Sequence, residues 1–315
     1  MAEFQDRGGD AMTRRGFLAA SAAAVTGFAA EPSRPIEVAA SDTFTEGPVF
    51  DANGALFFSN RTSVMRLSPE GKLSTWIEDA EAGFHGHRIL KDGSHLVCAS
   101  RGAKVLKVSA EGRIVGPASA ECDGKPLRAP NDLTLDGHGG FYFSDPGGSR
   151  EAPIGTVHYV DRAGKTSLAS GSMRVPNGLV LTPEGKTLYV AETQFNRILR
   201  FGVEAPGKLG PLEVFANLLS REGHAAEPDG LALDTEGNLY VAHLGMSAVE
   251  VLSRDGKRIR SIPAGIYDVS NLVFGGPDMN RLYITGSVGH RSKTAGRVMR
   301  VDLPGVRGVA TLPKA

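Results

Sequence analysis

The chain of 315 residues has only two cysteines, Cys98 and Cys122, and neither belongs to a CxxC pair or a Cys/His cluster, which excludes a zinc-finger type of site. It has no excess of either charge, with 35 basic and 35 acidic residues, which argues against a nucleic-acid-binding protein. Outside the N-terminus there is no apolar run of about 18 residues or more, so no membrane-spanning helix is expected. The 40 glycines are scattered rather than periodic, which excludes collagen. A hydrophobic content of 41% is enough for a large core.

The first 30 residues have the features of an export signal. The charged stretch 13–15 precedes the apolar run FLAASAAAVTGFAA, which ends near the small residues Gly27 and Ala29. Paired arginines followed by Phe-Leu resemble the twin-arginine type of signal. We therefore expect residues 1–30 to be removed, with Met1 or Met12 as the start, and residues 31–315 to form one domain in the periplasm of a bacterium, with no membrane attachment. The alternative is an apolar surface helix with a chance Arg-Arg pair.

One pattern recurs along the rest of the chain. In EPDGLALDTEGNLYVA, with Asp229 as position zero, apolar residues follow at plus 2 and plus 4, an acidic residue at plus 5 and a glycine at plus 8. The same register is found in EGPVFDANGALFFSN, NDLTLDGHGGFYFSD and NGLVLTPEGKTLYVAE, and more loosely in HGHRILKDGSHLVCAS and SNLVFGGPDMNRLYITGS. The residues at position zero are all polar: Glu46, His85, Asn131, Asn177, Asp229 and Asn271.

Each unit of the pattern predicts four short strands. Two strands flank the turn at plus 7 and plus 8, and two more follow, as in VMRLS-PEGK-LSTWI. Units of about 40 to 52 residues with this content are typical of propeller blades, so we predict an all-β, six-bladed β-propeller with four antiparallel strands per blade. Roughly 24 strands are too many for the competing two-sheet sandwich. IEVAA at 36–40 is a candidate for the strand that closes the ring with the last blade.

Position zero is expected at one mouth of the central channel, because it precedes the innermost strand of each blade. Asn-Gly and Asp-Gly are also ordinary turn dipeptides. However, the hairpin turn is already supplied at plus 7 and plus 8, and Glu46 is a poor turn former. A convergent set of carboxylate and amide oxygens suits a hard divalent cation, so the pattern predicts a metal site.

Seven short motifs in order give the chain a family resemblance. They are Glu-Gly-Pro-Val at 46–49, Pro-Asn-Asp-Leu at 130–133, Phe-Tyr-Phe-Ser-Asp-Pro at 141–146, Pro-Asn-Gly-Leu at 176–179, Leu-Tyr-Val-Ala-Glu-Thr at 188–193, Pro-Asp-Gly-Leu at 228–231, and Phe-Gly-Gly with Leu-Tyr-Ile-Thr at 274–276 and 282–285. With these motifs the chain resembles the SMP-30/gluconolactonase family of six-bladed propellers that hydrolyse sugar lactones.

The resemblance implies roles for particular residues. Glu46, Asn177 and Asp229 match the residues that hold one divalent metal in that family, and Asp229 also matches its proposed general base. Asn131 matches a residue that lies beside the metal and contacts substrate or a metal-bound water. The expected cofactor is therefore one divalent cation, calcium first, with zinc, magnesium or manganese as alternatives.

The chain departs from the family pattern in two places, which concern substrate identity more than reaction type. The second unit has His85-Gly86-His87 where Asn-Gly is usual, and Arg128 stands where an asparagine is common. We expect His85 and Arg128 to contact substrate; a rim histidine with an ordinary hydrogen bond and a solvent-facing arginine are the alternatives. The stretches 147–156, 219–228 and 286–296 are expected to be loops, which would bring Arg150, His243 or His290 to the substrate if they lie at the same mouth.

These observations predict a metal-dependent hydrolase that opens a small-molecule lactone, an aldonolactone such as gluconolactone, to its acid. The cation would polarise the carbonyl and stabilise the oxyanion, and Asp229 would take a proton from the attacking water, with Asp132 as a carboxylate able to share that task. No Gly-x-Ser-x-Gly elbow supports a nucleophilic serine. The alternatives are a different lactone, aryl-ester or organophosphate hydrolase, and a non-catalytic binding propeller stabilised by a metal.

Overall fold

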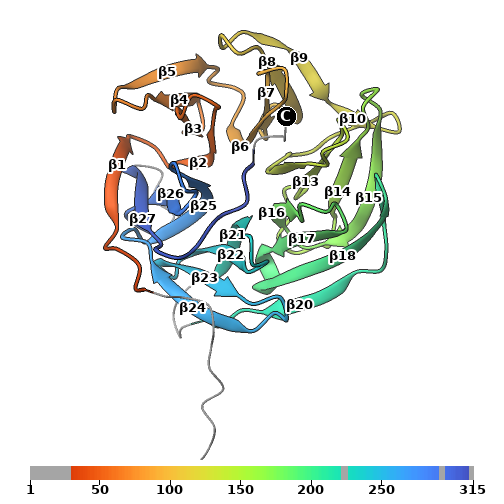
Figure 1. Ribbon diagram of the computed structural model, residues 1–315. Coiled ribbons are helices and arrows are strands. Elements are labelled where there is room, and N and C mark those ends of the chain that lie inside the picture. The colour runs from red at the N-terminus through yellow and green to blue at the C-terminus, as the bar shows by residue number, and fades with distance from the viewer. Residues whose placement is uncertain (1–29, 221–225, 291–294, 312–315) are drawn as a thin grey trace, which may run out of the picture.

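The computed structural model describes residues 30–220, 226–290 and 295–311, which form small antiparallel sheets arranged in a ring, a six-bladed β-propeller (Figure 1). The predicted fold is therefore confirmed. The predicted export signal lies outside the described residues, except for Ala30. No helix among the described residues is long and apolar enough to cross a membrane.

The blades follow one another along the chain, each with its innermost strand first. The first three blades are β2 (Glu46–Phe50), β3 (Leu56–Ser59), β4 (Ser63–Leu67) and β5 (Leu73–Glu78); β6 (Phe84–Ile89), β7 (His95–Ala99), β8 (Lys104–Val108) and β9 (Ile114–Ser119); and β12 (Leu133–Leu135), β13 (Phe141–Asp145), β14 (Gly155–Val160) and β15 (Thr166–Met173). A small hairpin of β10 (Glu121–Cys122) and β11 (Lys125–Pro126) separates the second blade from the third.

The last three blades have the same plan. They are β16 (Pro176–Leu181), β17 (Thr187–Glu192), β18 (Arg197–Ala205) and β20 (Glu213–Asn217); β21 (Glu227–Leu233), β22 (Leu239–Leu244), β23 (Ala248–Leu252) and β24 (Arg258–Pro263); and β25 (Asp268–Gly275), β26 (Arg281–Ser287), β27 (Gly296–Asp302) and β1 (Ile36–Ser41). The short β19 (Lys208–Leu209) also pairs with β18, and the 3-10 helix η1 (Thr193–Phe195) joins β17 to β18.

The ring is closed by the N-terminal strand. β1 pairs antiparallel with β27, with Ile36 opposite Arg300, so the last blade combines three C-terminal strands with one from the start of the chain. The proposed role of IEVAA is thus confirmed. With β1 in place the last blade has four strands like the others, and β27 is not left as an open edge that could pair with another molecule.

The hydrophobic core is divided among the interfaces between blades. Each of the six interfaces has its own cluster of buried apolar side chains; the cluster between the first and second blades, for example, includes Val49, Phe57 and Phe84. Because both faces of each sheet are covered by a neighbouring blade, the inner strands are buried on both faces. The two cysteines are free thiols: Cys98 is buried in one of these interfaces, and Cys122 is partly exposed.

The innermost strands β2, β6, β12, β16, β21 and β25 contact one another in ring order around the channel. Position zero of each unit lies within the first four residues of its innermost strand or, for Asn131, two residues before it, so the six residues gather at one mouth. At the other mouth the chain crosses the channel after β27, where Val309 N–H donates to Leu233 O at 2.9 Å and Gly308 N–H donates to Met279 O at 2.7 Å. In Figure 1 this dark blue segment runs through the centre of the ring.

Candidate functional site

The glycines that follow position zero allow the inner strands to approach closely. A Cβ on Gly178 would overlap Asp229 O, and a Cβ on Gly230 would overlap the side chain of Asn271 and lie 2.7 Å from its Cα. Neither glycine has a positive φ, and both lie inside strands, β16 and β21. Asp229-Gly230 is therefore not a turn: its glycine is required because the neighbouring strand leaves no room for a Cβ.

Asn271 links two acidic side chains across the channel. Its Nδ2 donates to Glu46 Oε2 at 3.1 Å and lies 3.3 Å from Asp132 Oδ2. Glu46 Oε2 also accepts from Gly47 N–H at 2.8 Å, and all three side chains are buried. Residues from the first, third and last blades thus meet at the channel axis.

Two further oxygen atoms at this mouth have no partner in the described part of the protein. Asn177 Oδ1 and Asp229 Oδ1 are buried and accept no hydrogen bond. Asp229 is 6% exposed, and its backbone packs against Gly178, which follows Asn177 directly. A buried polar atom without a partner costs free energy, so an oxygen pair of this kind is expected to have a ligand in the working protein.

The carboxyl groups at this mouth resist ionisation. Burial, together with the charge of Asp132, raises the pKa of Glu46 to about 7, although Gly47 N–H and Asn271 partly offset the effect. Burial raises the pKa of Asp229 well above its ordinary range, and the charges of Glu46 and Asp132 add to the rise. Burial also raises the pKa of Asp132. Mutual repulsion of this kind is the electrostatic condition that a cation relieves.

The residues present fit one hard cation. Glu46 and Asp229 supply carboxylate oxygens, and Asn177 supplies an amide oxygen that has no other partner. Among the described residues, no three His, Cys, Asp or Glu side chains stand close enough to form a metal site by themselves, so a cage here has to include amide oxygens. Carboxylate and amide oxygens are the ligands that calcium and magnesium prefer.

His85 and Asn131 lie next to this group of oxygens. His85 is half-buried at the second position of β6; burial lowers its pKa to about 4, and its Nδ1 has no hydrogen-bond partner in the described structure. The imidazole is therefore neutral at pH 7 and able to hydrogen-bond or act as a ligand. Asn131 is half-buried, and its backbone O accepts from Gly86 N–H at 2.8 Å, which fixes it beside the second blade.

Arg128 is exposed and bound to a neighbouring loop. Its Nη1 donates to Ile154 O at 2.7 Å, and its backbone N–H donates to Asp145 Oδ2 at 2.9 Å. The guanidinium thus links the chain before Asn131 to the loop between β13 and β14. Its role in binding substrate stays a prediction.

The described parts of the expected loops follow β13 and β26 or precede β21, at the mouth that carries position zero, and their residues differ in setting. Arg150 forms an ion pair with Glu227, and exposed His290 lies 3.4 Å from Asp268. His243 is not a loop or rim residue: it lies in β22, is fully buried and bonds through Nε2 to Asn196 Oδ1 at 2.8 Å. Residues 221–225, which include His224, are outside the described residues.

Arg88 was not anticipated from the sequence. It lies on β6, its Nη1 donates to His87 O at 2.7 Å and approaches Asp132 Oδ1 at 3.9 Å, and it is 5% exposed. Its charge therefore partly compensates that of Asp132. The only signal available in the sequence was its place three residues after His85 on a strand that lines the channel.

Comparisons with known proteins show the family and the fold of the chain. Residues 44–288 match the model of the SMP-30/Gluconolactonase/LRE-like region. The chain is 28% identical over 298 residues to a gluconolactonase of Zymomonas mobilis, covering 84% of this chain and 83% of the relative. It is 28% identical over 226 residues to lactonase drp35 of Staphylococcus epidermidis, covering 69% and 68%. Regucalcin from Agrobacterium tumefaciens, a calcium-binding protein, shares the fold with a TM-score of 0.74 at 22% identity, covering 87% of this chain and 95% of that chain.

Proposed function

The chain belongs to the SMP-30/gluconolactonase/LRE-like family, and from that premise we propose that it hydrolyses a lactone with the help of one divalent cation. The observation that carries the proposal is a pair of buried oxygens, Asn177 Oδ1 and Asp229 Oδ1, that have no partner among the described residues, at a mouth where Glu46 is near enough to raise the pKa of Asp229. Relatives named gluconolactonase and lactonase support a lactone as the substrate class, and an aldonolactone such as gluconolactone as the first candidate.

Glu46, Asn177 and Asp229 would hold the cation. When bound there, it would polarise the lactone carbonyl and stabilise the negative charge that develops on its oxygen. Calcium is the first candidate, because the donor set is all oxygen and regucalcin of the same fold is a calcium-binding protein; zinc, magnesium and manganese are the alternatives.

Asp229 is proposed as the general base. Its surroundings disfavour the charged form, because the carboxyl is buried and faces Glu46 and Asp132. The cation that Asp229 would hold offsets part of this effect, so the carboxyl is ionised when the cation is bound and able to take a proton from the attacking water. Asp132 keeps Asn271 in place and remains a second carboxylate for this proton.

The neighbouring residues would bind the rest of the substrate. Neutral His85 and the amide of Asn131 are proposed to hydrogen-bond ring oxygens or hydroxyl groups of the lactone. Arg128, held by the β13–β14 loop, would contact the outer part of the substrate. We also propose that the protein acts in the bacterial periplasm, as the signal-like residues 1–30 suggest.

The proposal is tested by following acid release with a pH indicator. Protein stripped with a chelator is reloaded with calcium, magnesium, manganese or zinc and given a panel of lactones, aryl esters and organophosphates. We expect turnover of an aldonolactone that depends on the added cation. Turnover confined to esters or organophosphates would reassign the substrate class, and no cation-dependent turnover on any compound would favour a binding propeller.

A single substitution tests the base. Asp229→Asn keeps the shape of the side chain and is expected to reduce turnover by at least about 100-fold, the lower range for a positioned proton acceptor, while the melting temperature is kept or raised. Asp255→Asn, at an exposed turn, is the control and should keep full activity. A rate near that of the unchanged protein in Asp229→Asn would show that another group takes the proton.

A further inference from the structure

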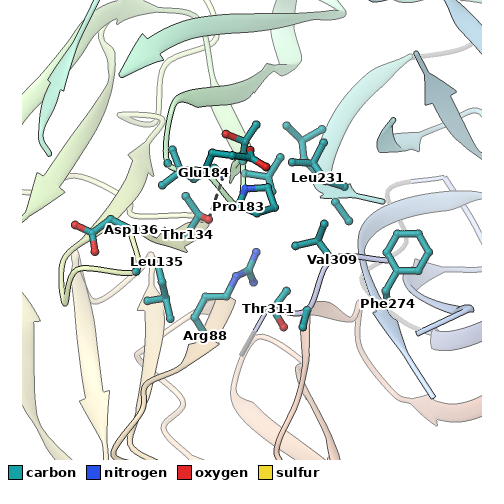
Figure 2. A pocket seen from close by; sticks show the side chains of 18 of the residues that line it. Arg88, Thr134, Leu135, Asp136, Pro183, Glu184, Leu231, Phe274, Val309 and Thr311 are labelled. Carbon is teal, nitrogen blue, oxygen red and sulfur yellow. Dashed lines mark hydrogen bonds between the residues drawn. The ribbon is translucent and has the colours of Figure 1, made fainter. Parts of the chain in front are cut away.

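A cavity lies at the mouth of the channel opposite to position zero. Its volume is about 440 Å³, within the range of small-molecule sites of roughly 300 to 1,000 Å³. The turns that follow the inner strands form its walls, and the C-terminal segment 309–311 lies across it. Figure 2 shows Val309 and Thr311 of this segment facing Leu231, Thr134 and Arg88.

Arg88 is the charged group inside this cavity. It is 5% exposed, and Figure 2 shows its guanidinium pointing into the centre of the space. One of its five N–H donors is used by His87 O, and Asp132 Oδ1 at 3.9 Å is too far for a hydrogen bond. Among the described residues no other acceptor is bonded to this guanidinium, so most of its donors are available to a ligand.

The other polar groups of the cavity complement an anion that carries hydroxyl groups. The hydroxyl of buried Thr134 accepts from Leu181 N–H at 3.3 Å and keeps its own proton to donate. The carboxylate of Asp136 does not compete for Arg88: it accepts from His138 N–H at 2.7 Å, Gly140 N–H at 2.8 Å and the hydroxyl of Tyr159 at 2.6 Å.

The remaining charges of the lining are exposed at its rim. Lys91 and Glu184 are both solvent-exposed and of opposite sign, so they contribute little to the charge of the interior. Leu231, Phe274 and Val309 supply apolar walls. The guanidinium of Arg88 also lies 3.9 Å from Asp132 Oδ1, so it shares its charge with that carboxyl, but its free donors face the cavity. Together with the threonine hydroxyls and apolar walls, they match a ligand with a single negative charge.

We propose that this cavity binds a small hydroxy acid, with its carboxylate against the guanidinium of Arg88 and its hydroxyl groups against threonine side chains such as Thr134. A guanidinium and a carboxylate form paired hydrogen bonds, and this geometry favours a carboxylate over a neutral polyol. The site goes beyond the proposed function and does not depend on it, because it lies at the other end of the channel and requires no cation.

The test is calorimetric titration of the full chain after chelation, so that the mouth with Glu46 and Asp229 has no cation to bind an acid. Gluconate is the probe, sorbitol is the neutral polyol control, and inorganic phosphate is the anion control. Three variants are compared with the unchanged protein: Arg88→Gln, Val309→Trp, which fills the cavity from the C-terminal segment, and Arg128→Gln at the opposite mouth.

We expect gluconate to bind the unchanged protein at one site with a Kd tighter than about 10 mM. Arg88→Gln and Val309→Trp should each bind gluconate at least about tenfold more weakly, on the order expected for a lost charged hydrogen bond. Arg128→Gln should bind as the unchanged protein does. Lack of saturable binding of gluconate to the unchanged protein overturns the proposal, and so does unchanged binding in Val309→Trp. If Arg88→Gln fails to fold, the result with Val309→Trp is sufficient for the test. Loss of binding in Arg128→Gln would place the acid at the other mouth, and equal binding of sorbitol or phosphate would overturn the ligand class.

Discussion

Replacing Glu46 by glutamine is expected to stabilise the cation-free protein at neutral and alkaline pH while it removes a ligand of the cation. The pKa of Glu46 is raised from its ordinary value of 4.5 to about 7, chiefly by burial. A difference of this size corresponds to about 3 kcal/mol between the protonated and ionised forms. The folded protein therefore holds a proton that the unfolded chain has already released.

The sign of the effect follows from this difference. Because the folded-state pKa is the higher one, the contribution of Glu46 to stability is fully present below about pH 4.5 and is lost as pH rises towards about 7. Glutamine has no proton to lose and keeps an oxygen that can accept from Gly47 N–H. The variant should thus equal the unchanged protein near pH 4 and exceed its free energy of unfolding by about 3 kcal/mol above about pH 8.

Buried histidines act in the opposite direction, so the difference between the two proteins is the quantity to measure. Burial lowers the pKa of His85, His95 and His243 to about 4, which makes the stability of both proteins rise with pH between about 4 and 6.5. Urea unfolding in chelator at a series of pH values gives the difference curve. Glu236→Gln, at an exposed turn, is the matched control.

Adding calcium should reverse the order of the two proteins. At a concentration of 1,000 times the Kd, a ligand that binds only the folded state adds about 4.1 kcal/mol, which exceeds the difference of about 3 kcal/mol between the two proteins, and the variant should gain much less because it has lost a carboxylate ligand. A flat difference curve in chelator, or a Glu46→Gln protein that is less stable at every pH, would refute the account of Glu46 as an uncompensated buried carboxyl.

Two further predictions concern the packing beside the site and the closure of the ring. Gly230→Ala should cost about 1–3 kcal/mol of stability and most of the turnover, because its Cβ would overlap the side chain of Asn271; Gly202→Ala, with nothing within 4 Å of its Cβ and no positive φ, should be neutral in melting temperature and activity. Equal effects of the two would contradict this role of Gly230. A chain that begins at residue 43 lacks β1 and leaves β27 as an edge, so it should melt at a lower temperature and aggregate, as followed by light scattering; an unchanged melting curve would show that β1 is dispensable.

The architecture could be predicted because its signals are local and repeated. The hairpin turn at plus 7 and plus 8 places Gly237 between β21 and β22, and the same spacing separates the two inner strands in the other units, with a looser turn in the last. Six weak copies of one pattern together specify the blade number. The closing strand β1 carries no such repeat, and its pairing with β27 depends on contacts between residues separated by most of the chain.

The internal connections of the site could not be predicted, because they join residues that only the ring brings together. Asn271 and Glu46 are 225 positions apart, and Asn271 and Asp132 are 139 apart. His85 and His87 would share a face of a regular strand, but the register shift between Phe84 and His87 separates them. His87 instead bonds to His95 at 2.7 Å in the interface between the first two blades, away from the channel.

The same packing explains why chemistry at this mouth is concentrated at position zero. Gly86 leaves room for the side chain of Asp132, and Gly230 leaves room for that of Asn271, so a glycine on one strand permits a polar group on the next. A larger residue at Gly230 would displace Asn271, which donates to Glu46, and one at Gly86 would displace Asp132, which accepts from Asn271. The position before each glycine faces the channel mouth and is free of this restriction. The presence of His85 where the family usually has asparagine therefore leaves the ring intact and changes the polar groups that line this mouth.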